Sequence, residues 1–261
     1  MEIMKFTETV FTEKGKKGVL TPDSDGYYTL IVGALNSYNS AGEFYTAEGA
    51  LQLFENSSHF MRRVKSGALY AELGHPKKIP GMSTEEFYNR VITIDEGNIC
   101  GHFSEITLDF EFGKKNPQLN NPEMIAIVAK VKPAGAKANA LQLALENPKQ
   151  NSAFSIRGLT ENKFDRGRMN RRLTNIITFD HVTEPGIKIA DKYMAPGLEH
   201  RLATEAIELT EVVDTMVDKT VLKRVLQNNM SHVGMESNRE FFSGIMNSLD
   251  KRPAHNRLSS W

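Results

Sequence analysis

The chain has 261 residues, of which 40% are hydrophobic and 25% are charged, enough for one large domain or one domain with an appendage. Lys and Arg number 32 and Asp and Glu also number 32, so no overall charge favours nucleic acid or a membrane surface as partner. The N-terminus mixes acidic and apolar residues, unlike a signal peptide, and no window approaches the roughly 18 apolar residues of a membrane span. We therefore expect a cytoplasmic location.

The single cysteine, Cys100, excludes an internal disulfide, and no second thiol near it suggests a structural zinc site. We expect Cys100 to be a small buried hydrophobe.

The first two thirds of the chain alternate strand patterns with a few helical ones. Residues 27–35 are rich in β-branched and aromatic side chains, and the Asn, Ser and Gly of residues 36–43 predict a loop after this strand. Apolar residues at helical spacing predict a helix over 46–67, ended by Gly67. Residues 90–112 and 123–135 alternate or run apolar, and are typical of antiparallel strands.

Strong helix formers predict a second helix over 136–150, which Pro148 ends. Two further strands are expected over 152–159 and 171–185, joined by the polar, arginine-rich segment 160–170. A strict alternation of strands and helices does not occur, so this part of the chain is expected to be mostly antiparallel β.

The last sixty or so residues have a different pattern. Apolar residues recur at three- and four-residue steps from Leu198 to Leu226, with acidic residues between them, and predict an amphipathic helix. A second amphipathic segment runs from Phe241 to Leu249. Pro196 and Gly197 mark the expected boundary, which divides the chain into a domain of residues 1–197 and a helical C-terminal segment of residues 198–261. This segment is either packed on the core or a detachable tail that binds a partner.

Three short segments contain residue types that suit acyl-transfer chemistry. "LYAELGHP" (69–76) places His75 in a turn, and histidine exchanges protons near neutral pH. "FSIRGL" (154–159) places Ser155 on the strand face opposite to its neighbours. In "FDHVTEPG" (179–186), Asp180 and His181 must face opposite sides of a strand, so only one of them can complete a site on a given face.

These three segments, in this order, resemble those of the phage prohead proteases, the capsid-maturation serine proteases of tailed phages. "NSAGEFY" (39–45) and the helix expected from residue 136 add weaker matches, and the resemblance covers roughly residues 25 to 195. It implies the α+β fold related to the herpesvirus assemblin protease, a mostly antiparallel β-barrel core surrounded by helices.

The resemblance implies that His75 is the general base, Ser155 the nucleophile and Asp180 the group that orients the imidazole. In the herpesvirus relatives the third group is a histidine, which leaves His181 as a rival to Asp180. We expect the oxyanion hole near Arg157 and Gly158, because glycine allows close approach of the backbone.

The family typically cleaves after glutamate, so the substrate pocket should carry a positive charge. The candidates, which fit one hairpin or a solvated basic loop, are Arg166, Arg168, Arg171 and Arg172. Four glutamates follow small or aliphatic residues as in the family's cleavage sites, and suggest autocatalytic removal of the C-terminal segment: Glu205, Glu208, Glu211 and Glu236. The implied substrates are the phage scaffold or core proteins and the major capsid protein, processed inside the assembling prohead in the host cytoplasm, with no cofactor and no metal.

Two alternatives belong to different classes. One is a non-enzymatic phage structural or scaffold-binding protein on the same fold, which Ser155→Ala would distinguish from a protease. The other is a metal hydrolase that uses His75, His102 and His181, but these histidines are dispersed and show no ligand spacing typical of a metal site.

Overall fold

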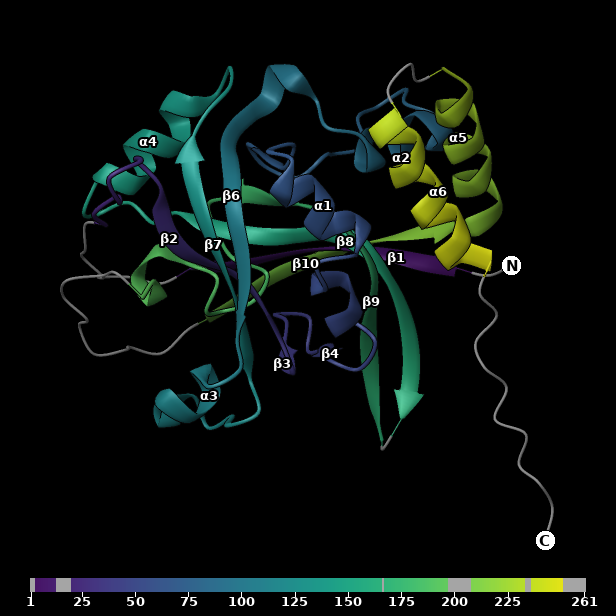
Figure 1. Ribbon diagram of the computed structural model, residues 1–261. Helices are drawn as coiled ribbons and strands as arrows, with labels where there is room; N and C mark the ends of the chain where they lie inside the picture. The colour runs from purple at the N-terminus through teal and green to yellow at the C-terminus, as the bar shows by residue number, and fades with distance from the viewer. Residues whose placement is uncertain (1–2, 13–19, 166, 197–207, 233–235, 251–261) are drawn as a thin grey trace, which may run out of the picture.

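The computed structural model describes residues 3–12, 20–165, 167–196, 208–232 and 236–250, and its strands form two sheets (Figure 1). The six-stranded sheet has the order β10 (Glu208–Asp218), β1 (Ile3–Thr12), β8 (Ala153–Asp165), β9 (Arg168–Val182), β4 (Phe44–Thr46) and β3 (Ser37–Tyr38). The four-stranded sheet has the order β2 (Tyr28–Leu35), β7 (Ile125–Pro133), β6 (Ile99–Asp109) and β5 (Tyr70–Glu72). Neighbouring strands are antiparallel except β4 and β9, which are parallel.

The two sheets share a core and meet where β5 approaches β9. The Phe103 ring of β6 packs edge-on against Phe154 and Phe179, which lie on β8 and β9, with ring centroids 5.8 and 5.9 Å apart. All three rings are almost fully buried. Beyond the end of β5, the Gly74 N–H donates to the His181 carbonyl at 2.7 Å. The described chain is therefore a mixed α+β fold in which curled antiparallel sheets enclose one main core.

Six helices accompany the sheets within the described residues: α1 (His59–Lys65), α2 (Thr84–Ile92), α3 (Phe112–Lys115), α4 (Ala138–Glu146), α5 (Lys219–His232) and α6 (Glu236–Asp250). Four short 3-10 turns complete the elements: η1 (Leu51–Phe54), η2 (Glu96–Asn98), η3 (Pro117–Leu119) and η4 (Lys192–Met194).

A second, smaller core joins the C-terminal helices to the sheet. Figure 1 shows α2, α5 and α6 grouped at one end of the molecule. Val91 and Ile92 of α2, Leu222 of α5 and Ile245 of α6 are buried in a cluster that also includes Ile177 of β9. Helix α2 is thus held between the sheet and the C-terminal helices.

Several predicted elements are confirmed, with local differences. The strands β2, β7 and the start of β8 lie where the sequence predicts them, and so does α4. The helix predicted over 46–67 is interrupted after η1, because Ser58 starts α1 as an N-cap that accepts from the Met61 N–H. The loop predicted after β2 contains the short strands β3 and β4.

The prediction was wrong in one internal segment. Residues 90–92 end α2, which begins with a capping box between Ser83 and Glu86, and the strand predicted from residue 90 starts only at Ile99.

The polar connection expected over 160–170 fitted either one hairpin or a basic loop. Its described residues belong to a long hairpin, in which β8 and β9 pair from Thr160↔Leu173 to Asp165↔Arg168.

The helix predicted over 198–226 was also wrong in its central part. Residues 208–218 form β10, which pairs with β1 from Ile3↔Asp218 to Thr12↔Glu208, and α5 starts only at Lys219. The apolar residues here recur at three- and four-residue steps, which favours a helix, but several side chains are β-branched, which favours a strand. Pairing with the distant strand β1 makes the segment a strand. The second predicted helix is confirmed as α6.

Among the described helices, none combines the length and the apolar character that crossing a membrane requires. Cys100 is fully buried, as expected, and burial raises the pKa of its thiol to about 12.

The second core yields a prediction on stability. Ile245→Ala removes a fully buried side chain between α6 and its neighbours, and should lower the free energy of unfolding by about 2–5 kcal/mol. The matched control is Asn247→Ala on the exposed side of the same helix, expected within about 0.5 kcal/mol of wild type. Urea unfolding measures both, and equal losses would mean that α6 does not pack on this core.

Candidate active site

The pairing of β8 with β9 brings two of the predicted site residues to one face of the sheet. Ser155 and Asp180 are direct partners in this antiparallel ladder, and directly opposed side chains project to the same face. Both residues are buried, Ser155 with 7% and Asp180 with 0% of its surface exposed. A hydroxyl and a carboxylate are therefore neighbours in a site that excludes most water.

The third residue arrives from the loop after β5. Gly74 has φ +75°, a conformation that favours glycine, and its N–H bond to the His181 carbonyl holds the loop against the end of β9. His75 follows, and its Nδ1 lies 2.8 Å from Asp180 Oδ2. His75 Nε2 is buried and makes no hydrogen bond to any residue that the structure describes. The imidazole is thus anchored at one nitrogen and open at the other.

The second oxygen of Asp180 is held by a buried arginine. Arg157 lies two residues after Ser155 on the same face of β8, and its Nη2 donates to Asp180 Oδ1 at 2.7 Å. The same Nη2 donates to Glu72 Oε1 at 2.9 Å. Burial alone would lower the pKa of Arg157, but the charges of Asp180 and Glu72 raise it above its usual value. The guanidinium therefore bridges two carboxylates.

Glu72 is the second carboxylate of this network and is fully buried. Arg90 of α2 donates to both of its oxygens, and the Asp95 N–H donates to Oε1 at 2.9 Å. Burial alone would raise the pKa of Glu72, but the hydrogen bond from Arg90 and the charge of Arg157 outweigh it and lower the pKa to about 2. Glu72 is ionised at any pH at which the protein would work.

His181, the rival to Asp180, lies on the other face of β9. Its Nε2 is 3.1 Å from Ser152 Oγ, and its ring packs on Phe154, its partner on β8, at 5.7 Å between centroids. Burial lowers the pKa of His181 to about 4. His181 is therefore a neutral side chain at neutral pH, and His75 contacts Asp180.

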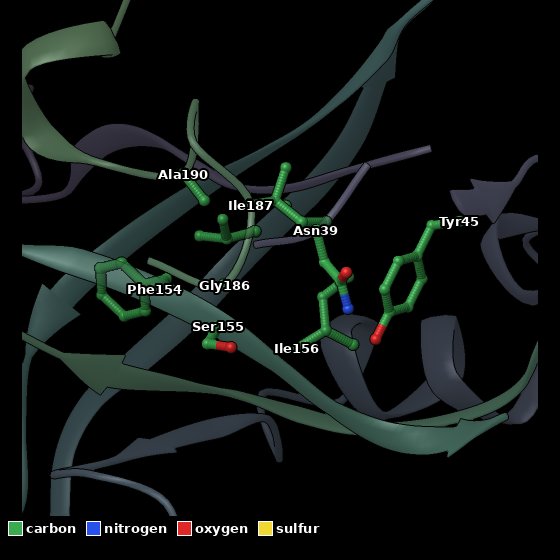
Figure 2. Close-up of a pocket in the computed structure, with 10 residues that line it drawn as sticks. Asn39, Tyr45, Phe154, Ser155, Ile156, Gly186, Ile187 and Ala190 are labelled. Atoms are coloured by element: carbon green, nitrogen blue, oxygen red, sulfur yellow. The ribbon is translucent and has the colours of Figure 1, made fainter. Parts of the chain in front are cut away.

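Ser155 also lines a pocket beside β8, on the edge of this strand opposite to the edge that pairs with β9. Figure 2 shows its hydroxyl beside the segment of Gly186 and Ile187, with the Asn39 amide and the Tyr45 hydroxyl across the same space. The pocket walls combine apolar side chains with these few polar groups, as substrate pockets do.

The segment 186–192 is tied to the strand that carries Ser155. The Phe154 N–H donates to the Ala190 carbonyl at 3.0 Å, and the Lys192 N–H donates to the Ser152 carbonyl at 2.8 Å. The Lys192 ammonium is buried and caps the end of α4 by donating to the Ala144 and Asn147 carbonyls. Burial lowers the pKa of Lys192 to about 8. This wall of the pocket is therefore fixed relative to Ser155.

Gly158 has a structural role independent of an oxyanion hole. It sits at an irregularity of the β8–β9 ladder, where a Cβ would come within 2.4 Å of the Asn175 carbonyl oxygen. Gly158 is also three residues along the strand from Ser155, which corresponds to about 10 Å. The position of Gly158 gives no support to the predicted oxyanion hole.

The predicted arginines are dispersed along β9. Arg171 is fully buried, pairs with Glu43 at 2.5 Å and donates to the Tyr45 hydroxyl at 3.2 Å. Arg168 stacks over the Phe44 ring at 3.6 Å, and the Arg172 side chain is exposed. Arg166 lies outside the described residues. Of the three arginines that the structure describes, only Arg171 is hydrogen-bonded to a residue that lines the pocket.

The glutamates proposed as cleavage sites lie at the C-terminal end of the chain. Glu208 and Glu211 belong to β10, and Glu236 is the first residue of α6. Glu205 lies outside the described residues.

The three histidines considered as metal ligands have separate partners. His102 lies on β6, where its ring nitrogens contact the Tyr27 hydroxyl and the Gly67 carbonyl. His75 and His181 contact Asp180 and Ser152, as described above. Within the part of the chain that the structure describes, no cluster of three or more His, Cys, Asp or Glu side chains has a geometry suited to a metal ion.

A family model and a curated relative both match most of this chain. The model of the Peptidase S80 family matches residues 6–248. The chain is 36% identical over 189 residues to the capsid maturation protease of Pseudomonas phage phiKZ. This alignment covers 71% of this chain and 67% of that protein. The solved structure of the bacteriophage T4 capsid assembly protease aligns with 72% of this chain and 97% of its own, at 13% identity and a TM-score of 0.41.

The buried His181 predicts how stability depends on pH. Because its pKa falls from 6.5 to about 4 on folding, the unfolded state binds more protons between these pH values. Stability should therefore decrease as the pH falls from 6.5 to 4, by about 3 kcal/mol from this residue. His181→Gln should remove this part of the pH dependence, which urea unfolding at several pH values measures. An unchanged pH dependence in the variant would contradict the assignment.

Proposed function

Because the chain belongs to the Peptidase S80 family, we propose that it is a serine endopeptidase that matures phage capsids. Ser155 is the nucleophile, His75 the general base and Asp180 the orienting acid. One observation carries this proposal: Asp180 is the strand partner of Ser155 and also holds His75 Nδ1 at 2.8 Å. Asp180 thus links the histidine to the strand pair that carries the serine, which supports the assignment.

The mechanism follows from the tautomer that Asp180 selects. A carboxylate only accepts hydrogen bonds, so His75 keeps its proton on Nδ1 and presents the Nε2 lone pair as the base. On substrate binding, Nε2 takes the proton of Ser155 Oγ as this oxygen attacks the scissile carbonyl. The imidazolium then gives the proton to the leaving amine, and an acyl-enzyme remains. Water activated by His75 hydrolyses the ester and restores Ser155.

We place the oxyanion hole in the segment 186–187 rather than at Gly158. Gly186 lines the pocket together with Ser155. Hydrogen bonds between residues 152–154 and residues 190–192 hold the segment after Ile187 in place. Gly186 and Ile187 are buried, yet neither N–H donates a hydrogen bond within the described structure. Buried N–H groups are nearly always paired, so donors left open beside a nucleophile suit a developing oxyanion.

For specificity we propose cleavage after glutamate, with Arg171 rather than Arg168 or Arg172 as the recognition charge. Arg171 reaches the pocket through the Tyr45 hydroxyl, and its ion-pair partner Glu43 accepts a hydrogen bond from the Asn39 amide at 3.1 Å. Tyr45 and Asn39 both line the pocket. A substrate carboxylate would meet polar groups that Arg171 and Glu43 orient.

The proposed substrates are phage capsid and scaffold proteins, and the chain itself. Among the four glutamates, cleavage at Glu205 would release β10 and both C-terminal helices, whereas cleavage at Glu236 would separate α6 from α5. A relation of the fold to the herpesvirus assemblin protease and action inside the assembling prohead remain parts of this proposal. A non-enzymatic scaffold-binding protein on the same fold is the alternative.

Ser155→Ala tests the proposal directly. It should abolish processing of the capsid or scaffold protein and of the chain itself, with a loss of about 10⁴-fold or more. Mass spectrometry of the products gives the new termini and shows whether they follow glutamate. Ser57→Ala is the control, because it removes an exposed serine hydroxyl in the turn before α1 and should preserve processing. Processing that continues in Ser155→Ala would refute the triad, and no processing by wild type would favour the alternative.

Tyr45→Phe tests the proposed specificity. The change removes one hydroxyl from the pocket wall and keeps the ring. KM should rise about fivefold for peptides with glutamate before the cleaved bond, the scale of one lost hydrogen bond, and change less for the matched glutamine peptides. Equal effects on both peptides would argue against recognition of the carboxylate through Arg171.

A further inference from the structure

We propose that Glu72 is a positioning residue for the catalytic base, acting through Arg157 on Asp180. The proposal rests on the proposed function and adds a residue with its own role. Glu72 does not contact His75 or Ser155 in the described structure. It would act by fixing the guanidinium that orients Asp180, and by setting the net charge that His75 experiences.

The geometry supports an action through Arg157. One nitrogen, Arg157 Nη2, donates to Asp180 Oδ1 at 2.7 Å and to Glu72 Oε1 at 2.9 Å. The other terminal nitrogen, Nη1, donates to the Thr93 carbonyl at 3.2 Å, just after α2 ends. The guanidinium is therefore held from two sides, and one of the two anchors is Glu72.

Glu72 is itself held by several hydrogen bonds. Besides Arg157 and Arg90, it accepts hydrogen bonds from the Asp95 N–H at 2.9 Å and from the Asn98 amide at 3.1 Å. It also precedes His75 by only three residues, so the same short segment carries the anchor of Arg157 and the base. A shift of Glu72 would move both partners of Asp180 together.

The charges give the second part of the role. Arg157 alone would neutralise Asp180 and weaken its attraction for a proton on His75. Glu72 compensates the charge of Arg157, and Arg90, whose side chain is 24% exposed, in turn compensates part of Glu72. The positive charge that His75 gains as the base should therefore be stabilised less when Glu72 loses its charge, and more when Arg90 does.

The other ionisable groups near the pair do not change this sign. The groups around His75 and Asp180 come from six elements: Arg157 on β8, Glu72 on β5, Arg90 on α2, Arg63 on α1, Cys100 on β6 and His181 on β9. Burial keeps Cys100 and His181 neutral near pH 7, and Arg63, with a pKa lowered to about 10 by burial and by Arg157, remains charged. These charges are the same in every variant below.

The test compares Glu72→Gln with Arg90→Gln. The rate at which a fluorophosphonate probe labels Ser155 is measured against pH, because its acidic limb reports the base of the free enzyme. Glu72→Gln should move this limb to lower pH by about half a unit or more and reduce the plateau rate on the order of tenfold. Arg90→Gln should move the limb to higher pH. Glu85→Gln, an exposed charge change on α2, should leave the limb in place.

Both variants should also weaken the fold, so a loss of stability alone would affect them in the same way. Opposite shifts of the acidic limb are therefore specific to the positioning role. Limbs that stay at the wild-type pH, or shift in the same direction, would overturn the role of Glu72. If Glu72→Gln does not fold, Arg90→Gln decides alone, and Glu72→Asp, which keeps the charge, should retain the wild-type limb at a reduced rate. Wild-type protein that the probe does not label at Ser155 would instead refute the proposed function.

Discussion

The guanidinium of Arg157 is the constraint on which the site depends. A buried cation is costly unless its charge and its hydrogen bonds are matched, and here two buried carboxylates and a backbone carbonyl surround it. Meeting these requirements brings together β8, β9, β5 and the end of α2. The interaction that makes Arg157 tolerable in the core is thus also the one that orients the carboxylate of Asp180.

Strand register is the second constraint. A slip of one residue between β8 and β9 would exchange the faces of Asp180 and His181, so that a buried neutral imidazole would replace the carboxylate. The irregularity at Gly158 pins this register, because only glycine permits the approach to the Asn175 carbonyl. The glycine that the sequence suggested for the oxyanion hole thus serves the site by fixing the alignment of its strands.

The sequence allowed several strands of both sheets to be predicted, but fewer of the contacts between segments that are distant in the chain. The strand at 27–35 and the helix after residue 136 carry clear local patterns. Three short segments suggested His75, Ser155 and Asp180 through their resemblance to a protease family, and in the structure His75 contacts Asp180, the strand partner of Ser155. Glu72 stands in the same segment as His75, yet its role depends on Arg157, 85 residues away, and on Arg90. Local patterns do not reveal such partners. For the same reason residues 208–218 were misread, because their strand is specified by pairing with the N-terminus.

That pairing has a consequence for the timing of folding. Strand β1 bonds to β10 along nearly its whole length, from Ile3↔Asp218 to Thr12↔Glu208, whereas with β8 it shares the pair Lys5↔Thr160. Strand β1 is therefore synthesised long before the strand that covers its edge. Such non-local pairing folds slowly. In a nascent chain this sheet stays incomplete until β10 has been synthesised, so the sheet that carries Ser155 can close only after that point.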